Sequence, residues 1–266
     1  MAESAPTRPP RVLVPDLAEH RESSEGDGKE KEIFLRKEER EHVRSRRLRD
    51  GDEVVALDGK GARAVARIVR AGAAIALSPS KQIFSSSSSF PSSSSSSSLS
   101  FPGEPANRVV VALACAEPAR VEWAIEKGTE CGAAGFVLLD AGRSQRAHVA
   151  ALAKRIPRLI RIAEEATKQC DRTIVPFVEG PKSTEEFLRG LIGREAFVVL
   201  DPSGAAAERS GAHGDLVVAI GPEGGFAPSE ILLFAEKSPV FLSLGPRILR
   251  LETAVVVALA RLVDPA

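Results

Sequence analysis

LVVAIGPEGGFAPSEI, at residues 216–231, decides the fold of this chain together with VFLSLGPRILRLETA at residues 240–254. Each stretch begins with a run of β-branched residues and leucine, which is typical of strands buried on both faces of a parallel sheet. Each then makes a Gly-Pro turn and leads into a helical pattern. Open α/β sheets bind ligands where their strands end, and glycines there let the backbone approach a ligand. The two loops therefore predict one shared ligand pocket.

The C-terminal part of the chain alternates such apolar runs with helical patterns. This alternation predicts an α/β domain with a mainly parallel sheet. Pro157 lies inside the second helical pattern, where we expect a kink or a break. The predicted strands are 109–114, 135–139, 173–178, 196–200, 216–220 and 240–244, and the predicted helices are 118–131, 148–170, 183–191, 228–236 and 251–263.

The N-terminal part has a different pattern, with short apolar runs separated by turns. Asp58-Gly59 lies between two of these runs and is a hairpin signal, because glycine supplies the positive φ of tight turns. This predicts a small β-barrel with a short helix, and a serine-rich disordered linker follows it. The barrel strands are predicted at 33–35, 53–57, 64–69 and 74–77, its helix at 38–48, and the domains at 1–80, 81–105 (linker) and 106–266.

Composition excludes several classes of protein. The 36 Lys and Arg residues equal the 36 Asp and Glu residues, so no overall basic charge marks a nucleic-acid partner. Three widely spaced cysteines form neither a disulfide framework nor a metal site, which predicts no metal and a reducing compartment. No apolar run is long enough for a membrane span, and no targeting segment is visible, so we expect a soluble intracellular protein. The GxGxxG and GxxxxGK[ST] fingerprints are both missing, which argues against dinucleotide and ATP sites.

IGPEGGFAPSEI at 220–231 and LGPRILRLETA at 244–254 resemble the two signature loops of the RsmE family of RNA methyltransferases. Weaker similarities lie in RVEWAIEKGTECG at 120–132 and EATKQCDRTIVP at 165–176. The resemblance implies a SPOUT-type α/β fold with a trefoil knot and an N-terminal PUA-like barrel. It also implies methylation of N3 of a uridine in small-subunit (16S-type) ribosomal RNA, with S-adenosyl-L-methionine as the cofactor and a homodimer as the active form.

The same resemblance implies which residues hold the cofactor, mostly through backbone groups. They are Leu200, Asp201, Pro202, Ile220, Gly221, Pro222, Glu223, Gly224, Gly225, Ser243, Leu244, Gly245, Ile248, Leu249 and Thr253. The chain departs from the family in one signature, because Leu251 stands where the family usually has threonine. One hydroxyl near the cofactor or the target base is therefore missing.

Methylation at uracil N3 requires that this nitrogen lose its proton or that cations stabilise the resulting anion. Arg250 and Arg247 are the candidates for anion stabilisation. Glu223 and Glu252 are candidates for the base, or for orienting those arginines. Two structural roles remain open: Glu252 also favours the helix dipole in a first turn, and Glu223 could simply fix its own loop.

Two basic stretches, 36–49 and 143–161, predict contacts with RNA phosphates, although such charge runs are often only solvated surface. The RNA-binding candidates are Arg11, His42, Arg44, Arg46, Arg47, Arg143, Arg146 and Arg172. Trp123 is predicted to lie in the core or in a dimer interface. Two alternatives stay open, a catalytically inactive RNA-binding relative and a SPOUT enzyme for another RNA site. The expected compartment is the cytoplasm, or a plastid or mitochondrion in a eukaryote.

Overall fold

The computed structural model describes residues 9–17, 31–77, 103–191, 195–206 and 214–264. Its contacts divide the chain into two compact units, Met1–Pro102 with Asp171–Ile174, and Gly103–Cys170 with Val175–Ala266. The serine-rich linker predicted at 81–105 lies almost wholly outside the described residues. The predicted domain boundaries therefore stay a prediction.

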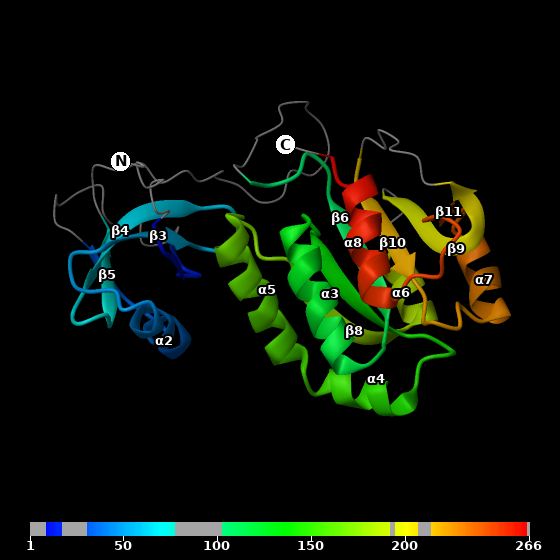
Figure 1. Cartoon of the computed structure of the whole chain (residues 1–266), viewed down its shortest axis with the longest axis horizontal. Helices are drawn as coiled ribbons and strands as arrows, with labels where there is room; N and C mark the ends of the chain where they lie inside the picture. The colour runs from blue at the N-terminus through cyan, green and yellow to red at the C-terminus, as the bar shows by residue number, and fades with distance from the viewer. Residues whose placement is uncertain (1–8, 18–30, 78–102, 192–194, 207–213, 265–266) are drawn as a thin grey trace, which may run out of the picture. The chain divides into compact units, whose positions relative to one another are not determined.

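The first unit contains a five-stranded sheet with the strand order β1-β3-β4-β5-β2 (Figure 1). β1 and β3 pair in parallel, and the other neighbours are antiparallel. Its apolar core includes Val12, Val54, Ile68 and Ile75, with Val43 contributed by the helix. This is the β-rich N-terminal fold that the sequence predicted. The elements are β1 (Arg11–Leu13), β2 (Lys31–Phe34), α2 (Lys37–Ser45), β3 (Glu53–Leu57), β4 (Arg63–Val69) and β5 (Ala74–Leu77).

The strand predicted at 173–178 begins four residues later, as β8 at Phe177, and the prediction is wrong for residues 173–176. Asp171–Ile174 belongs to the first unit, where Ile174 forms isolated bridges with Gly59 and Lys60. The backbone N–H of Gly61 also donates to the carbonyl of Thr173 at 3.2 Å. A run of Thr, Ile and Val suits an extended segment anywhere, so its composition could not say which strand would pair with it.

The second unit contains a six-stranded sheet with the order β11-β9-β10-β6-β7-β8, and every neighbouring pair in it is parallel. This confirms the predicted α/β class. β9 is longer than predicted, because its second half pairs with β11 after a register shift. The strands are β6 (Val109–Ala114), β7 (Gly135–Asp140), β8 (Phe177–Ser183), β9 (Ala196–Ala206), β10 (Leu216–Ile220) and β11 (Val240–Ser243).

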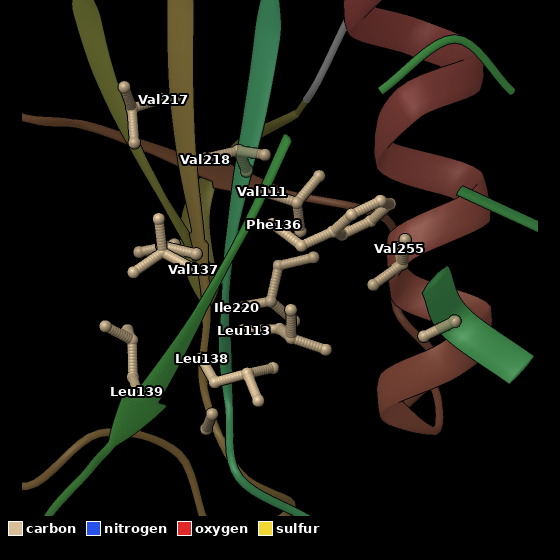
Figure 2. Packing of buried hydrophobic residues seen from close by; sticks show 14 of the residues in the cluster. Val111, Leu113, Phe136, Val137, Leu138, Leu139, Val217, Val218, Ile220 and Val255 are labelled. Atoms are coloured by element: carbon tan, nitrogen blue, oxygen red, sulfur yellow. The ribbon is translucent and has the colours of Figure 1, made fainter. Parts of the chain in front are cut away.

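The core of this unit follows from strand alternation and register. Val111 is in register with Phe136 on one side and with Val218 on the other, so the three side chains share one face. Figure 2 shows this face turned toward Val255, while Val137 and Val217 point to the opposite face. All five of these valines and Phe136 are buried, as expected for strands covered on both sides.

Helices follow most strands of this sheet: α3 (Pro118–Glu130), α4 (Arg146–Ala153), α5 (Ile156–Cys170), α6 (Thr184–Gly190), α7 (Pro228–Ala235) and α8 (Leu251–Leu262). α3 packs against both α5 and α8, which lie beside it in Figure 1. The helix predicted at 148–170 is interrupted, as expected, just before Pro157, which stands at the second residue of α5 where its missing N–H costs nothing. The trefoil knot stays a prediction.

Candidate active site at the carboxyl edge of the sheet

The three predicted cofactor segments lie on three neighbouring strands: residues 200–202 lie inside β9, and the other two segments begin at the last residues of β10 and β11. β9, β10 and β11 are adjacent in the sheet, and Val199 of β9 is in register with Ala219 of β10 and with Phe241 of β11. Because these positions are aligned across parallel strands, the segments that start at 200, 220 and 243 begin next to one another. Their role in binding a cofactor stays a prediction.

The loop after β10, residues 221–226, is held by side chains from several elements. Arg143 donates a hydrogen bond to the carbonyl of Gly224, and Gly225 donates its N–H to the carbonyl of Pro222 at 2.7 Å. Phe226 is buried, and its ring meets Phe234 of α7 edge to face at 4.8 Å between centroids. The first loop is therefore built before any ligand arrives.

Glu223 has a partner that the sequence did not suggest. Its carboxylate is hydrogen-bonded by Arg120 of α3, whose side chain is about one third exposed. This bond raises the pKa of the Arg120 guanidinium, and the charges of Glu252 and Glu117 add to the effect. Among the described residues the partner of the Glu223 carboxylate is Arg120 rather than Arg247 or Arg250, and the role of Glu223 as a base or as an orienting group stays a prediction.

The loop after β11 is far more exposed. Ser243 receives the N–H of Gly245 at its hydroxyl, at 3.3 Å, and Ile248 is 91% exposed. Arg247 and Arg250 are also exposed, and within the described parts of the chain neither side chain makes a hydrogen bond or an ion pair. Both guanidinium groups are thus free to meet an incoming anion.

α8 begins directly after this loop. Arg250 is its N-cap residue, without a side-chain capping bond, and Leu251 is buried in the core. Leu251 thus fills an apolar position, which gives the change from threonine a structural reason. The Oε2 atom of Glu252 is buried and has no hydrogen-bond partner among the described residues.

Asp201 and Pro202 lie where β9 changes register against β11. The Asp201 carboxylate accepts the N–H of Ser203 at 2.8 Å, which makes a local turn. Gly204 follows, and a side chain there would meet the backbone of Phe241 at 2.6 Å. The glycine is needed for this close approach of two strands.

A pocket of about 420 Å³ opens at the same edge of the sheet. Its walls come from the end of β6 with the start of α3, from the loop between β7 and α4, and from residues 222–224. Cys115 lies in this pocket, where burial and, second, the charge of Asp140 raise its pKa to about 12. A thiol with such a pKa stays protonated, so the pocket does not present a thiolate nucleophile.

Sequence reasoning missed Glu230, a buried carboxylate that ties three segments together. Its Oε1 accepts from Thr184 at 2.7 Å and from the N–H of Gly142 at 3.1 Å. Its Oε2 accepts from the N–H of Ala227 at 2.8 Å. Nothing in the sequence indicated the partners of Glu230 in other elements.

The RNA-binding candidates fall into two sets. Arg44, Arg46 and Arg47 are exposed, as phosphate contacts require, and His42 is partly buried. Arg146 is also exposed, at 85%, and it pairs with Asp140 at 2.7 Å. By contrast, Arg172 is only 4% exposed, and the largely buried Arg11 forms an ion pair with Asp171.

Neither a metal nor a membrane has support from the described residues. In that part of the chain no cluster of three or more His, Cys, Asp or Glu could hold a metal ion. A search of the same residues finds no helix with the length and apolar character of a membrane span.

Relatives carry the names of RNA-modifying enzymes. Ribosomal RNA small subunit methyltransferase E of Bacillus subtilis (strain 168) is 32% identical over 170 residues, which cover 58% of this chain and 64% of that protein. The protein of the same name from Synechocystis sp. (strain ATCC 27184 / PCC 6803 / Kazusa) is 33% identical over 161 residues, covering 58% of this chain and 52% of its own. The matches therefore span between about half and two thirds of these relatives.

Solved structures show the same fold over nearly the whole chain. Ribosomal RNA small subunit methyltransferase E from Neisseria gonorrhoeae, bound to S-adenosyl methionine, has a TM-score of 0.75 at 22% identity and covers 95% of this chain and 96% of its own. A putative methyltransferase from Legionella pneumophila, in complex with the same cofactor, has a TM-score of 0.74 at 24% identity, with 96% of both chains covered.

Family comparison agrees with the division into a barrel and a parallel sheet. Residues 35–74 match a family described as an RNA methyltransferase PUA domain. Residues 103–263, which are more than half of the chain, match a family described as an RNA methyltransferase domain. With its parallel sheet and its two Gly-Pro loops at one edge, the chain belongs to this RNA methyltransferase family.

Proposed function

We propose that this protein is a methyltransferase that uses S-adenosylmethionine to methylate N3 of a uridine in small-subunit ribosomal RNA. The observation that carries the proposal is that the segments starting at 200, 220 and 243 begin at aligned positions of the neighbouring strands β9, β10 and β11. The names of the relatives support the RNA substrate, and the titles of the two structural neighbours support the cofactor.

The residues at this edge fit the cofactor. Backbone groups at 200–202, 220–225 and 243–249, with Thr253, would hold it, and the open space around Gly245 leaves room for a ligand. The buried, unpartnered Oε2 of Glu252 can accept from an amino or hydroxyl group, and a bound ligand would explain why it lacks a protein partner. When bound, S-adenosylmethionine supplies an electrophilic methyl group, and its sulfur keeps the electron pair of the broken C–S bond.

The residues of the chain must then make uracil N3 a nucleophile. The N3–H bond breaks and its proton passes to an acceptor, which leaves the N3 electron pair free to form the new N–C bond. Glu252 is our candidate acceptor, because Arg120 already holds the carboxylate of Glu223. Arg250 and Arg247, free and exposed next to the positive end of α8, stabilise the uracil anion.

We also propose that the protein acts as a homodimer. Trp123 of α3 is 44% exposed and Ile160 of α5 is 36% exposed, on two helices that pack against each other. This exposure removes the core alternative for Trp123 and favours the interface. Sedimentation should give a dimer for the wild type and a monomer for Trp123→Glu, whereas a monomeric wild type would contradict the proposal.

The proposed substrate also implies a cellular compartment. A protein that modifies small-subunit particles would work in the compartment that holds bacterial-type ribosomes. That compartment is the cytoplasm of a bacterium, or a plastid or mitochondrion in a eukaryote.

The decisive experiment is methylation of bacterial-type small-subunit particles with labelled S-adenosylmethionine, followed by mass spectrometry of the nucleosides. We expect N3-methyluridine from the wild type and about 100-fold less from Arg250→Ala, the usual cost of losing one anion-stabilising group. Arg189→Ala, an exposed arginine of α6, is the matched control and should match the wild type.

Three other outcomes would contradict the proposal. Methyl groups on ribose or on transfer RNA would indicate a SPOUT enzyme with another target. No incorporation, together with no cofactor binding in calorimetry, would indicate an RNA-binding relative without catalysis. Equal activity of Arg250→Ala and the wild type would remove Arg250 from the mechanism.

A further inference from the structure

The pocket of about 420 Å³ lies on one side of β10, and two of the three predicted cofactor segments lie on the other side. These two are residues 200–202, inside β9, and residues 243–249, which begin at the end of β11. The pocket is walled by residues after β6 and β7, which lie on the other side of β10. The loop after β10 contributes Pro222, Glu223 and Gly224 to the pocket wall. The loop after β10 is therefore a shared wall, because it borders the pocket and also belongs to the predicted cofactor segments, so a base in the pocket would lie next to the cofactor.

Arg143 stands at that shared wall. It donates a hydrogen bond to the carbonyl of Gly224, and its Cδ lies 3.6 Å from where a side chain on Gly224 would begin. Among the described residues no carboxylate pairs with Arg143. A guanidinium carries five N–H donors and no acceptor, so donors remain for a ligand and the positive charge stays uncompensated.

Ser144, the next residue, supplies a second sign that a ligand is expected. Its Oγ is buried and has no hydrogen-bond partner among the described residues, although Ser144 lines the pocket. Gln145 and His148 line the same wall and add polar groups. A buried hydroxyl without a partner is costly, and a bound polar molecule would satisfy it.

The N–H donors of Arg143 can hydrogen-bond uracil better than cytosine. Uracil presents carbonyl oxygens, which accept hydrogen bonds, on both sides of N3. Cytosine presents an amino group, a donor, in place of the O4 carbonyl. A side chain that only donates therefore favours uracil, and its charge also favours the anion that forms when N3 loses its proton.

From these observations we propose that the pocket receives the uracil base of the target nucleotide, and that Arg143 is the residue that selects it. This inference rests on the proposed function, because only that function makes a uridine in RNA the substrate. Ser144 supplies a second hydrogen bond to the base. Arg120 acts as a positioning residue, since its bond to Glu223 fixes the wall that Arg143 lies against.

The test compares Arg143→Ala, Arg143→Lys and Ser144→Ala with the Arg189→Ala control. We expect Arg143→Ala to lower kcat/KM for the RNA about 100-fold, the cost of one lost anion-stabilising group, and Arg143→Lys to recover part of it. Ser144→Ala should lower it about tenfold, as for one hydrogen bond. Calorimetry should give the wild-type Kd for S-adenosylmethionine in Arg143→Lys, which can keep the bond to the Gly224 carbonyl, in Ser144→Ala and in the control.

A binding readout that needs no methyl transfer separates this inference from the proposed function. Small-subunit ribosomal RNA containing 4-thiouridine is irradiated with the wild-type protein, and the cross-linked peptide is identified by mass spectrometry. We expect cross-links within residues 143–148. Cross-links there without any methylation would leave the pocket standing and overturn the proposed function.

Two results would contradict the inference that this pocket binds uracil, and would leave the proposed methyltransferase function intact. One is N3-methyluridine formed at normal rates by both Arg143→Ala and Ser144→Ala, with cross-links only at residues 247–250. The other is loss of S-adenosylmethionine binding in both Arg143→Lys and Ser144→Ala, which would place these residues in the cofactor site.

Discussion

The two Gly-Pro loops share a motif but differ in how the protein holds them. The loop after β10 is fixed by Arg120, by Arg143 and by the packing of Phe226 on α7. In the described part of the chain, the loop after β11 packs Leu244 and Leu249 on the core and has local hydrogen bonds between Ser243 and Gly245, while Ile248 is 91% exposed. The loop after β10 is therefore fixed by contacts with other elements, whereas the tip of the loop after β11 is exposed to solvent.

This difference suggests a division of labour. A preformed wall can place two ligands relative to each other without spending binding free energy on ordering itself. An exposed loop with two unpaired arginines gains its contacts only when the cofactor, the RNA or a second subunit arrives. Mutations in the first loop should therefore cost stability, and mutations in the second should cost function.

The largest expected effect comes from Phe226→Ala. Its ring is 8% exposed and meets Phe234, which is fully buried and also contacts Phe197 at 5.5 Å between centroids. Truncating a buried phenylalanine costs about 3–4 kcal/mol, which urea denaturation followed by circular dichroism would measure. Ile248→Ala, the matched truncation in the second loop, should change stability by less than about 0.5 kcal/mol. Equal losses of stability in Phe226→Ala and Ile248→Ala would mean that the protein holds both loops equally firmly.

Glu230→Ala should have the next largest effect on stability. It would leave the hydroxyl of Thr184 and the N–H groups of Gly142 and Ala227 without their acceptor. We expect a loss of about 2–3 kcal/mol in the free energy of unfolding, because buried donors without partners are costly.

Glu230→Gln is the control for this second prediction. The amide keeps the shape of the side chain and one oxygen, so it should lose less than the alanine variant. A stability of Glu230→Ala equal to the wild type would mean that water replaces the carboxylate, and that α7 does not depend on it.

Local patterns in the sequence predicted most of the fold. Leu216–Ile220 and Val109–Ala114 were found within a residue, because a continuous β-branched run that ends at a turn has few alternatives. The interruption before Pro157 followed from the missing N–H of proline. In the site, the pattern placed both Gly-Pro loops after strands of one parallel sheet, as the structure has them, and their shared ligand pocket stays a prediction.

Pairings between distant residues could not be predicted. Arg120 and Glu223 are 103 residues apart, and nothing in either segment marks the other as its partner. Glu230, Thr184 and Gly142 depend on the same kind of distant contact. Residues 173–174 were misassigned for this reason as well, because their partners, Gly59–Gly61, lie in the first unit. Local sequence sets backbone preferences, whereas the choice of partner depends on the whole fold.

A smaller loss of stability is expected from replacing one glycine in each loop, and the two loops should lose similar amounts. Gly225 has φ +71° and Gly245 has φ +118°, a region that residues with a side chain rarely adopt. Alanine at either position should cost about 1–2 kcal/mol in unfolding free energy. Gly224→Ala is the control, since a side chain there meets only ordinary contacts, and it should cost less than about 0.5 kcal/mol. A loss at Gly225 alone would show that the second loop relaxes around the substitution.

The smallest expected effect concerns the helix behind the first loop, and it depends on pH. Glu122 of α3 binds Arg158 through both oxygens, each at 2.8 Å, and Arg155 at 3.0 Å. The hydrogen bond from Arg158 is the main reason that the pKa of Glu122 lies below its usual value of 4.5. A carboxylate with a lowered pKa stabilises the folded state at neutral pH, and that contribution disappears as the pH falls through the lowered value.

Glu122→Gln should therefore reduce the free energy of unfolding by about 0.5–1 kcal/mol at pH 7, since both arginines are substantially exposed. The difference from the wild type should shrink below pH 4.5 and should also shrink in high salt. A difference that persists at low pH would mean that Glu122 acts through packing rather than charge. In that case α3, and with it Arg120, is held in place by its apolar contacts with α5 and α8, and the wall of the first loop is independent of pH.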